Sequence, residues 1–555
     1  MTSDFAGTVR IAKLREMENE IYDVLVIGGG ITGAGIALDA QRRGMKTALI
    51  EMQDFAAGTS SRSTKLVHGG LRYLKQLEVK MVAEVGKERA IVYENGPHVT
   101  TPERMLLPLY KGGTFGRLST SFGLRFYDFL AGVKREERRR MLSAADTAAI
   151  EPLLKKEGML GGGSYVEYRT DDARLTIEVL KKAAESGATA VNYAMAERFL
   201  YDDEGKTTGV LARELTGGGE HRIRARRIVN ATGPWVDELR ELDRSKHGKT
   251  LRLTKGVHLV FDGGRFPLRQ AIYFDTPDGR MVFAIPRDGK TYVGTTDTDY
   301  AGDTAHPRAT AEDRDYLLAA CNGMFPGVGL DGQDVESSWA GLRPLIYEEG
   351  KSPSEVSRRD EIFVSPSGLI TIAGGKLTGY RKMAETVVDR LAASLRAEGR
   401  GPYSPCTTRE LPISGGDVGG SARYPQYVRA VADAGEVIGL PADAALRIAG
   451  RYGSNARAVF ERIARREEGE GGGLSDETYG MLTYAIEAEM AVKPADFLIR
   501  RTGALYFDFA GTLRNRDAVI DYMAMSLGYS AGQREAYAAE LEREMSASQI
   551  LDSNR

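Results

Sequence analysis

The chain has 555 residues, more than one hydrophobic core can hold, and its 42% hydrophobic and 27% charged content is that of a globular protein. A formal net charge of −2 gives no support for bulk nucleic-acid binding, and two cysteines, Cys321 and Cys406, are too few for a structural zinc site or a disulfide framework. Residues 1–20 form a polar lead-in without an apolar signal core, and no segment approaches the ~18 apolar residues of a membrane span, so we expect a soluble or peripheral protein in a reducing compartment.

Residues 22–51 have the pattern of a dinucleotide-binding βαβ unit. Residues 24–27 are apolar and mostly β-branched, which is typical of a strand buried on both faces, and residues 47–50 are a second strand candidate. The glycines between them follow the G-x-G-x-x-G spacing: Gly28, Gly30 and Gly33. This spacing allows a tight turn, a close approach to a pyrophosphate and close helix–strand packing, and Glu51 stands where an acid binds a ribose hydroxyl. A glycine-rich turn in an ordinary βαβ unit is the alternative.

The segment 52–73 is a glycine- and hydroxyl-rich loop with little periodicity. Its donors suit contacts to a phosphate or a ring, although a solvent-facing connector has the same composition. The candidates are Ser60, Ser61 and Thr64. A helix is predicted over residues 74–94, before Asn95-Gly-Pro97.

Between residues 105 and 186 the sequence predicts two strands and a capped helix. The strand candidates are 105–110 and 165–168, and the glycines at 161–163 are interpreted as a turn. Asp171 and Asp172 precede an amphipathic segment and are expected to cap its amino-terminal end.

Two more strand–turn–helix junctions follow, at residues 231–233 and 374–378. The segment 251–300 between them is typical of antiparallel strands, because Pro-Asp-Gly and Pro-Arg-Asp-Gly turns separate its apolar runs. A helix is predicted over 311–325, a Gly/Pro-rich linker near 396–416, and mostly helices over 420–545.

These elements predict an α/β nucleotide-binding domain, an α+β platform and a helical carboxy-terminal cap. The predicted boundaries are 20–105, 165–245 and 340–395 for the discontinuous nucleotide-binding domain, 106–164 and 246–339 for the antiparallel substrate-binding domain, and 405–550 for the helical domain. On its own the G-x-G-x-x-G fingerprint fits NAD as well as FAD. The two later junctions favour a single site long enough for a flavin, and the sequence shows no second fingerprint for a pyridine nucleotide beside it.

Taken together, the motifs resemble those of the FAD-dependent glycerol-3-phosphate dehydrogenases. The matching segments are 28–35, 60–73, 231–235, 341–344, 374–378 and 494–503, within a likeness that runs from about residue 20 to 545. The resemblance implies a glutathione-reductase-type FAD-binding Rossmann domain of the D-amino-acid oxidase branch, with an antiparallel substrate platform. It also implies oxidation of sn-glycerol 3-phosphate to dihydroxyacetone phosphate by hydride transfer to FAD, with electrons passed to a membrane quinone.

The same resemblance assigns site residues. The implied substrate pocket consists of Arg72, Tyr73, Arg343, Arg359 and Lys376, and Arg358 beside Arg359 leaves a one-residue ambiguity. Arginine suits this task because its planar fork binds two phosphate oxygens at once. The implied FAD contacts are Gly28, Gly30, Gly33, Glu51, Ser60, Ser61, Thr64, His68, Thr232, Gly233, Gly375, Lys376, Leu377 and Thr378.

The catalytic group is expected to comprise His258, Arg343 and Lys376, without a metal. His258 is the first candidate for the base, because an ordinary histidine pKa near 6.5 suits proton transfer at neutral pH, and His68 is the second. Either residue has a structural histidine as its alternative.

The partners implied are glycerol 3-phosphate, a quinone and a transient membrane contact, with no nucleic acid, and a homodimer is left open. We expect a cytoplasmic protein that docks at the inner face of the cell membrane. Three rival functions remain open: an oxidase that passes electrons to O2 and makes H2O2, an amino-acid or sarcosine oxidase, and a non-catalytic flavin-binding protein.

Overall fold

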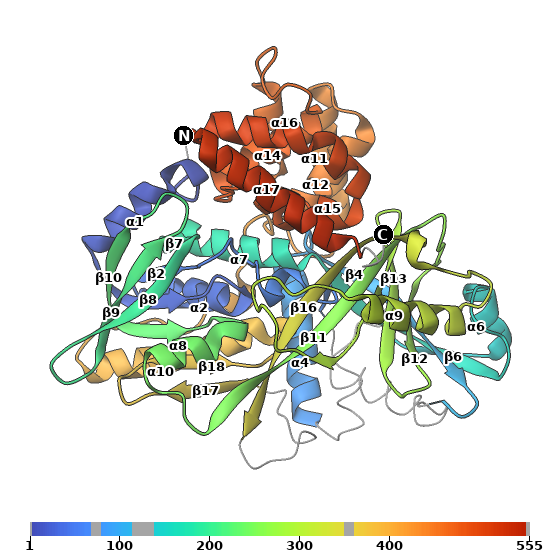
Figure 1. Cartoon of the computed structure of the whole chain (residues 1–555), viewed down its shortest axis with the longest axis horizontal. Coiled ribbons are helices and arrows are strands. Elements are labelled where there is room, and N and C mark those ends of the chain that lie inside the picture. The colour runs from blue at the N-terminus through green and yellow to red at the C-terminus, as the bar shows by residue number, and fades with distance from the viewer. Residues whose placement is uncertain (1–2, 68–78, 114–137, 349–359, 551–555) are drawn as a thin grey trace.

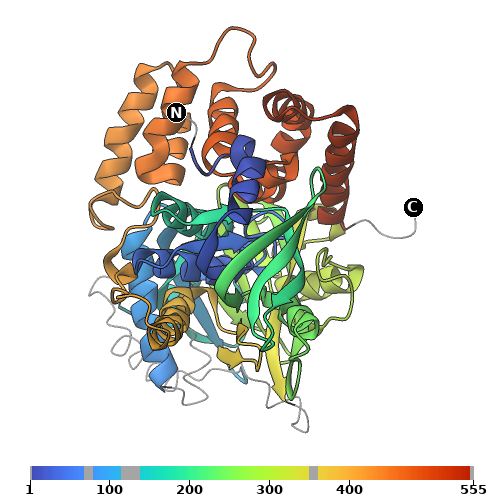
Figure 2. The ribbon, with the colours of Figure 1, turned by 90° about the vertical axis from the view of Figure 1, so that its left-hand side faces the viewer.

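The structure is a computed structural model that describes residues 3–67, 79–113, 138–348 and 360–550. It contains a mainly parallel sheet with helices, a mainly antiparallel sheet, and a group of carboxy-terminal helices (Figure 1). In the view of Figure 1 the parallel sheet lies on the left, the antiparallel sheet on the right, and the carboxy-terminal helices across the top. Figure 2, turned by 90°, shows the same helices again gathered at one end.

The first sheet is built around β1 (Ile21–Ile27), the buried strand that the sequence predicts. It pairs in parallel with β2 (Thr47–Ile50) on one side and with β10 (Glu220–Asn230) on the other. The described strand order is β17-β18-β10-β1-β2-β7, with β8 and β9 as an antiparallel ribbon beside β10. The other strands are β7 (Thr189–Val191), β8 (Ala194–Tyr201), β9 (Thr207–Glu214), β17 (Glu361–Val364) and β18 (Ile370–Ala373).

Alternate side chains of β1 enter two hydrophobic cores. Val24 and Val26 pack with the apolar faces of α2 (Ile31–Arg42), α7 (Asp172–Glu185) and α10 (Tyr380–Ala397). Leu25 and Ile27 pack on the other side, with α1 (Arg10–Glu18) and the β8–β9 ribbon. Each such side chain contributes about 1.5–3 kcal/mol on full burial, so the strand that carries the glycine turn is firmly fixed.

The second sheet is the predicted platform. In the described residues its order is β15-β11-β14-β13-β12-β4-β6-β3, with β16 beside β11 and β5 beside β6. The hairpins predicted in 251–300 are confirmed by the antiparallel pairs β12–β13 and β13–β14. The strands are β3 (Leu66–Val67), β4 (Thr100–Tyr110), β5 (Arg140–Leu142), β6 (Met159–Thr170), β11 (Lys249–Asp262), β12 (Ala271–Asp275), β13 (Met281–Arg287), β14 (Lys290–Gly294), β15 (Thr298–Asp299) and β16 (Val335–Glu348).

The turn predicted at residues 161–163 is wrong. These glycines lie inside β6 and pair with β4, for example Gly163 with Leu107. A Cβ on Gly161 would lie 2.4 Å from the Leu142 carbonyl oxygen, so glycine lets β5 approach closely. The predicted domain boundaries near 105, 165 and 340 fall inside β4, β6 and β16. Each of these strands lies entirely in the platform sheet.

The helices complete the three parts. The helix predicted over 311–325 is confirmed as α9 (Ala311–Met324), and Asp171 accepts a hydrogen bond from the Arg174 N–H as the predicted cap of α7. The carboxy-terminal helices are α11 (Tyr424–Val437), α12 (Ala442–Tyr452), α13 (Ala456–Ala464), α14 (Asp476–Ala488), α15 (Ala504–Phe507), α16 (Phe509–Leu527) and α17 (Ala531–Ser548). The remaining helices are α4 (Val79–Asn95), α6 (Ala144–Ile150) and α8 (Val236–Leu242). Within the described part of the chain, every helix is too short or too polar to cross a membrane.

Buried charges join the helical region to the first sheet. Asp54, just after β2, is 1% exposed and accepts hydrogen bonds from Arg501 Nη1 at 2.5 Å and Nη2 at 2.9 Å. Arg500 Nε also donates to Asp54, and its Nη2 donates to Asp496 at 2.6 Å. Both arginines lie in a π-helical turn (Asp496–Arg501) that precedes α15, so this turn connects the two parts through ion pairs.

Candidate active site

A cavity of about 990 Å³ lies between the two sheets. One end is lined by the carboxyl ends of β1, β10 and β18, where parallel strands present their turns. The other end is lined by the platform strands β11, β13 and β16. A ligand that spans this cavity therefore contacts all three predicted strand–turn–helix junctions and the platform at once.

The glycine turn after β1 is dictated by close packing. Gly28 has a φ of +113°, and a Cβ there would lie 2.5 Å from the Ala231 carbonyl oxygen at the second junction. A Cβ on Gly33 would lie 1.9 Å from the Gly28 carbonyl oxygen, so α2 can begin here only with glycine. Gly30 faces the cavity, and Ser60 Oγ beside it accepts the Ile31 N–H at 2.9 Å. The backbone at the start of α2 is thus open to a pyrophosphate.

Glu51 lines the cavity at the end of β2. Its Oε2 accepts the Gly29 N–H at 2.6 Å and its Oε1 accepts the Gln53 N–H at 2.8 Å. Burial, with a smaller contribution from Asp54, raises the pKa of Glu51 although these N–H donors oppose the shift. A carboxylate has about four acceptor positions, so these N–H groups leave capacity for a ribose hydroxyl. The residue fits the adenosine half of a dinucleotide.

The second and third junctions face the middle of the cavity. Thr232 Oγ1 donates to Asn230 Oδ1 at 2.7 Å, and Gly233 takes a positive φ of +58° as the chain enters α8. At the third junction a Cβ on Gly375 would lie 2.5 Å from Met383 Sδ, so the turn packs directly on α10. Leu377 and Thr378 line the cavity just before α10, where backbone N–H groups lie at the positive end of a helix dipole.

Arg343 is presented by β16 on the cavity wall. Its Nη2 donates to Thr295 Oγ1 at 2.9 Å, and its Nη1 donates to the Thr296 carbonyl oxygen at 3.1 Å and to Asp297 Oδ1 at 3.2 Å. Space for the guanidinium comes from Gly256 on β11, where a Cβ would lie 2.4 Å from Arg343 Nη2. The side chain is 34% exposed, so a solvent-accessible anion in the cavity can reach it.

His258, on β11, lines the same end of the cavity. Its ring stacks on Trp339 at 4.7 Å between centroids, and its Nε2 lies 3.0 Å from Thr64 Oγ1. Burial lowers the pKa of His258 well below its ordinary value, and the charges of Arg343 and Lys65 lower it further. The imidazole is therefore neutral at pH 7 and can accept a proton, but it is a weaker base than an exposed histidine.

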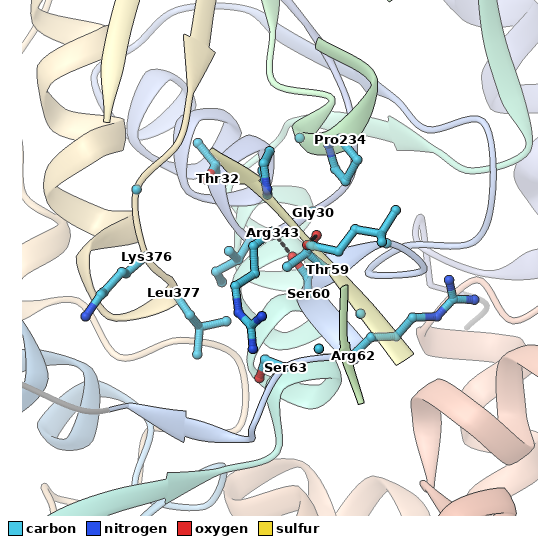
Figure 3. A pocket seen from close by; sticks show the side chains of 18 of the residues that line it. Gly30, Thr32, Thr59, Ser60, Arg62, Ser63, Pro234, Arg343, Lys376 and Leu377 are labelled. Atoms are coloured by element: carbon cyan, nitrogen blue, oxygen red, sulfur yellow. Dashed lines mark hydrogen bonds between the residues drawn. The ribbon is translucent and has the colours of Figure 1, made fainter. Parts of the chain in front are cut away.

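Figure 3 shows that the charged ends of three basic residues at the cavity wall point in different directions. Arg343 projects into the centre of the view, whereas the amine of Lys376 and the guanidinium of Arg62 point outward on opposite sides. Arg62 Nη1 donates to the Ala305 carbonyl oxygen at 3.0 Å, which fixes that direction. Lys376 lines the cavity with its backbone at the third junction. Of these three cations, Arg343 is the one that the view places centrally.

The structure thus brings together most of the residues that the sequence singled out. Those that line the cavity are Gly28, Gly30, Glu51, Ser60, Thr64, Thr232, Gly233, His258, Arg343, Gly375, Lys376, Leu377 and Thr378. Gly33 and Ser61 lie behind the wall, where Ser61 is 2% exposed. His68, Arg72, Tyr73, Arg358 and Arg359 lie outside the described residues.

Sequence reasoning missed the partners of Arg343. Thr295, Thr296 and Asp297 follow β14 and line the cavity. The available signal was the hydroxyl- and carboxyl-rich run Gly294-Thr-Thr-Asp-Thr-Asp299 directly after a predicted strand.

The fold and the cavity define an FAD-dependent oxidoreductase. A family model described as "FAD dependent oxidoreductase" matches residues 23–381, and one described as "C-terminal domain of alpha-glycerophosphate oxidase" matches residues 406–534. The chain is 61% identical over 525 residues to the aerobic glycerol-3-phosphate dehydrogenase of Bacillus subtilis (strain 168), with 94% of each covered. It is 58% identical over 536 residues to that of Staphylococcus aureus (strain USA300), with 96% of each covered. The chain belongs to the aerobic glycerol-3-phosphate dehydrogenase family.

Solved structures agree with this assignment. The glycerol-3-phosphate dehydrogenase from Bacillus halodurans, complexed with FAD, superposes with a TM-score of 0.86 at 50% identity and 98% coverage of each chain. The L-alpha-glycerophosphate oxidase from Mycoplasma pneumoniae, with a TM-score of 0.56 at 18% identity, covers 70% of this chain and 97% of its own, and shares the fold. The predicted family, fold class and FAD cofactor are confirmed.

Proposed function

We propose that the protein oxidises sn-glycerol 3-phosphate to dihydroxyacetone phosphate by hydride transfer to FAD, and that a membrane quinone takes up the electrons. The observation that carries this proposal is Arg343, held by Thr295 and Asp297 at the platform end of a dinucleotide-sized cavity. A phosphate dianion in a partly dry site needs a fixed cation, and guanidinium is suited to bind it with two hydrogen bonds.

The substrate phosphate is assigned to Arg343, with Arg72, Tyr73, Arg359 and Lys376 as the other proposed pocket residues. Lys376 is proposed to act nearer the flavin, because it lies at the third junction and its amine points away from Arg343 in Figure 3. Arg343 would orient the substrate so that the carbon bearing the secondary hydroxyl faces the middle of the cavity, between the second and third junctions.

The hydroxyl proton needs an acceptor on the platform side. His258 is the proposed acceptor among the described residues, because its ring is neutral and lies on the cavity wall beside Thr64. Because burial lowers the pKa of His258, any loss of rate from its protonation should come at a lower pH than for an ordinary histidine. His68 is the second candidate.

FAD, when bound, supplies the two-electron acceptor for the substrate hydride. The chain holds its ADP half with Gly28, Gly30 and Glu51, and the backbone N–H groups at Leu377 and Thr378 favour negative charge on the reduced ring. We propose that reoxidation by quinone requires transient docking of this cytoplasmic protein at the inner membrane face.

Anaerobic reduction tests the proposal. Glycerol 3-phosphate added without oxygen should bleach the flavin band near about 450 nm, and a soluble quinone analogue should restore it faster than air does. Reoxidation faster in air, with one H2O2 per turnover, would indicate the oxidase instead. A band that survives millimolar substrate would leave a non-catalytic flavin-binding protein.

The phosphate assignment has its own test. Arg343→Ala should raise KM steeply, because a charge-assisted contact contributes ~1.5–3 kcal/mol, which corresponds to about a 10- to 150-fold change. Arg343→Lys keeps the charge but loses the bidentate fork, so an intermediate KM is expected. Arg252→Ala, at a half-exposed pair with Asp299 outside the cavity lining, is the control. An unchanged KM in Arg343→Ala removes this residue from the pocket.

A further inference from the structure

The short segment from Ser61 to Lys65 runs under the platform end of the cavity and is held by one buried acid. Lys65 has a φ of +56°, a backbone conformation that side chains other than glycine rarely adopt. Such a conformation persists only where surrounding contacts fix it. The contacts come from Asp172, in the first turn of α7, which is 0% exposed.

Asp172 accepts hydrogen bonds from the residues on both sides of Thr64. Its Oδ2 accepts the Ser63 N–H at 3.0 Å and the Ser63 hydroxyl at 2.7 Å. Its Oδ1 accepts the Lys65 Nζ at 2.6 Å and the Ala173 N–H at 2.9 Å. Lys65 Nζ also donates to the Ser61 carbonyl oxygen at 3.0 Å. Three of these four bonds hold the loop and the fourth, from Ala173, lies within α7, so all acceptor positions expected of a carboxylate are used.

The loop in turn fixes the groups on the cavity wall. Thr64 Oγ1 meets His258 Nε2 at 3.0 Å, and the Thr64 carbonyl oxygen accepts the Tyr292 hydroxyl at 3.2 Å. Trp339 Nε1 donates to the Ser63 carbonyl oxygen at 3.1 Å, while the Trp339 ring stacks on His258. A shift of Ser63 or Lys65 would therefore move Thr64 and His258 together.

The same pair sets the local charge. The Lys65 and Asp172 side chains are 5% and 0% exposed, so neither charge is screened by water. Lys65 Nζ lies 5.2 Å from the centroid of Trp339, the ring on which His258 stacks. Lys65 acts on His258 strongly enough to lower its pKa, and Asp172 is the partner that compensates this cation.

We propose that Asp172 and Lys65 are positioning residues of the active site: a buried ion pair that holds Thr64 and His258 at the cavity wall and balances the charge at the platform end of the cavity. The inference rests on the proposed function for its kinetic readout only. Its electrostatic readout, the midpoint potential of the bound flavin, needs no substrate.

The test uses the FAD-loaded enzyme and three variants: Asp172→Asn, Lys65→Met and the double variant. Asp172→Asn leaves the Lys65 cation uncompensated, so the flavin midpoint potential, titrated with dithionite and mediator dyes, should rise. Lys65→Met should lower it, and the double variant should return close to wild type. With glycerol 3-phosphate, each single variant should lose at least tenfold in kcat while KM changes less than threefold, because Arg343 is undisturbed.

A matched control is available on the same helix. Lys181 and Glu178 form an ion pair whose side chains are also 5% and 0% exposed, and neither residue is in the cavity lining. Glu178→Gln and Lys181→Met should lower thermal stability but leave the potential unchanged and kcat within twofold. Should Asp172→Asn fail to retain FAD, Lys65→Met and the double variant carry the test.

Two results would overturn the inference. Unshifted potentials in the single variants, or shifts of the same sign, would show that the pair sets no charge at the flavin. A kcat within twofold of wild type in Lys65→Met would show that it positions nothing. A wild-type flavin that glycerol 3-phosphate does not reduce would instead refute the proposed function, while the potentials would still decide the inference.

Discussion

Asp54→Asn should weaken the attachment of the helical region to the cofactor domain. Asp54 accepts from Arg501 at 2.5 and 2.9 Å, from Arg500 Nε, and from Asn192 Nδ2 at 3.0 Å, all in the dry interior. An amide at this position cannot neutralise two guanidinium groups. Arg500 would keep its ion pair with Asp496 at 2.6 Å. Arg501 would be left with Glu489 as its remaining carboxylate partner, 3.9 Å from the Arg501 Nε.

Asp54→Asn should lower the free energy of unfolding of this region by about 3–5 kcal/mol, the cost of removing one partner from a buried ion pair. A chain of this size need not unfold in one step, so global melting alone is a poor measure. Amide hydrogen exchange of residues 424–548 in the FAD-loaded protein measures the local opening directly. Protection there should fall by about two to three and a half orders of magnitude, while the strands of the platform change less.

The pH dependence of this loss has a definite sign. Burial alone would raise the pKa of Asp54, but the charges of Arg501 and then Arg500 outweigh it and lower the pKa from 3.8 to about 2. A lowered folded pKa means that the stabilisation is complete above the unfolded value and is lost as pH falls through about 2. The difference between wild type and Asp54→Asn should therefore be constant from pH 5 to 8.

An exposed pair supplies the control. Asp299→Asn breaks the pair with Arg252, whose side chains are 63% and 35% exposed, and should leave the exchange of residues 424–548 unchanged because solvent screens the pair. If exchange of residues 424–548 in Asp54→Asn matches that of Asp299→Asn, the buried arginines do not hold the helical region in place.

Three further changes have definite expected outcomes. Gly33→Ala places a Cβ 1.9 Å from the Gly28 carbonyl oxygen, so purified protein should contain little flavin by absorbance, whereas Gly323→Ala, with open space around it, should keep its flavin. Gly256→Ala crowds Arg343 Nη2 at 2.4 Å, so KM should rise with flavin content unchanged; a normal KM would show that the guanidinium has another resting place. His306 donates to Glu544 on α17, and this contact raises the pKa of His306. Its contribution to stability, about 0.2–1 kcal/mol because solvent screens the pair, should be present below pH 6.5 and lost as pH rises through the raised pKa. Amide hydrogen exchange of α17 in His306→Gln should then differ from wild type at pH 6 and converge with it at pH 9.

Local patterns were sufficient for the elements that bind the nucleotide. The apolar run before Gly28, the glycine spacing and the cap at Asp171 all act within a few residues, so the sequence displays them directly. Glu51 contacts Gly29 from 22 positions away, but the βαβ pattern fixes where this acid stands. The platform hairpins were equally visible, because each turn carries its own Pro, Asp and Gly.

Contacts between distant segments were not visible. The glycines at 161–163 were taken for a turn because glycine marks turns, whereas here they admit Leu142 on β5 and Thr147 on α6. The seat of Arg343 combines β16 with the end of β14, and nothing in the local sequence of either pairs them. Asp54 and Arg501 are 447 positions apart, and only the folded chain shows that they neutralise each other.

The three junctions that line the cavity also set an order for biosynthesis. Gly28 and Thr378 are separated by about 350 residues, which corresponds to roughly 20–70 s of translation at ~5–20 residues per second. During this time the first glycine turn is complete, but the last wall of the cavity does not yet exist. An early nascent chain could bind only the adenosine half of a dinucleotide. We therefore expect flavin insertion to be late, so that free FAD during the last third of synthesis matters more for the yield of active enzyme than free FAD earlier.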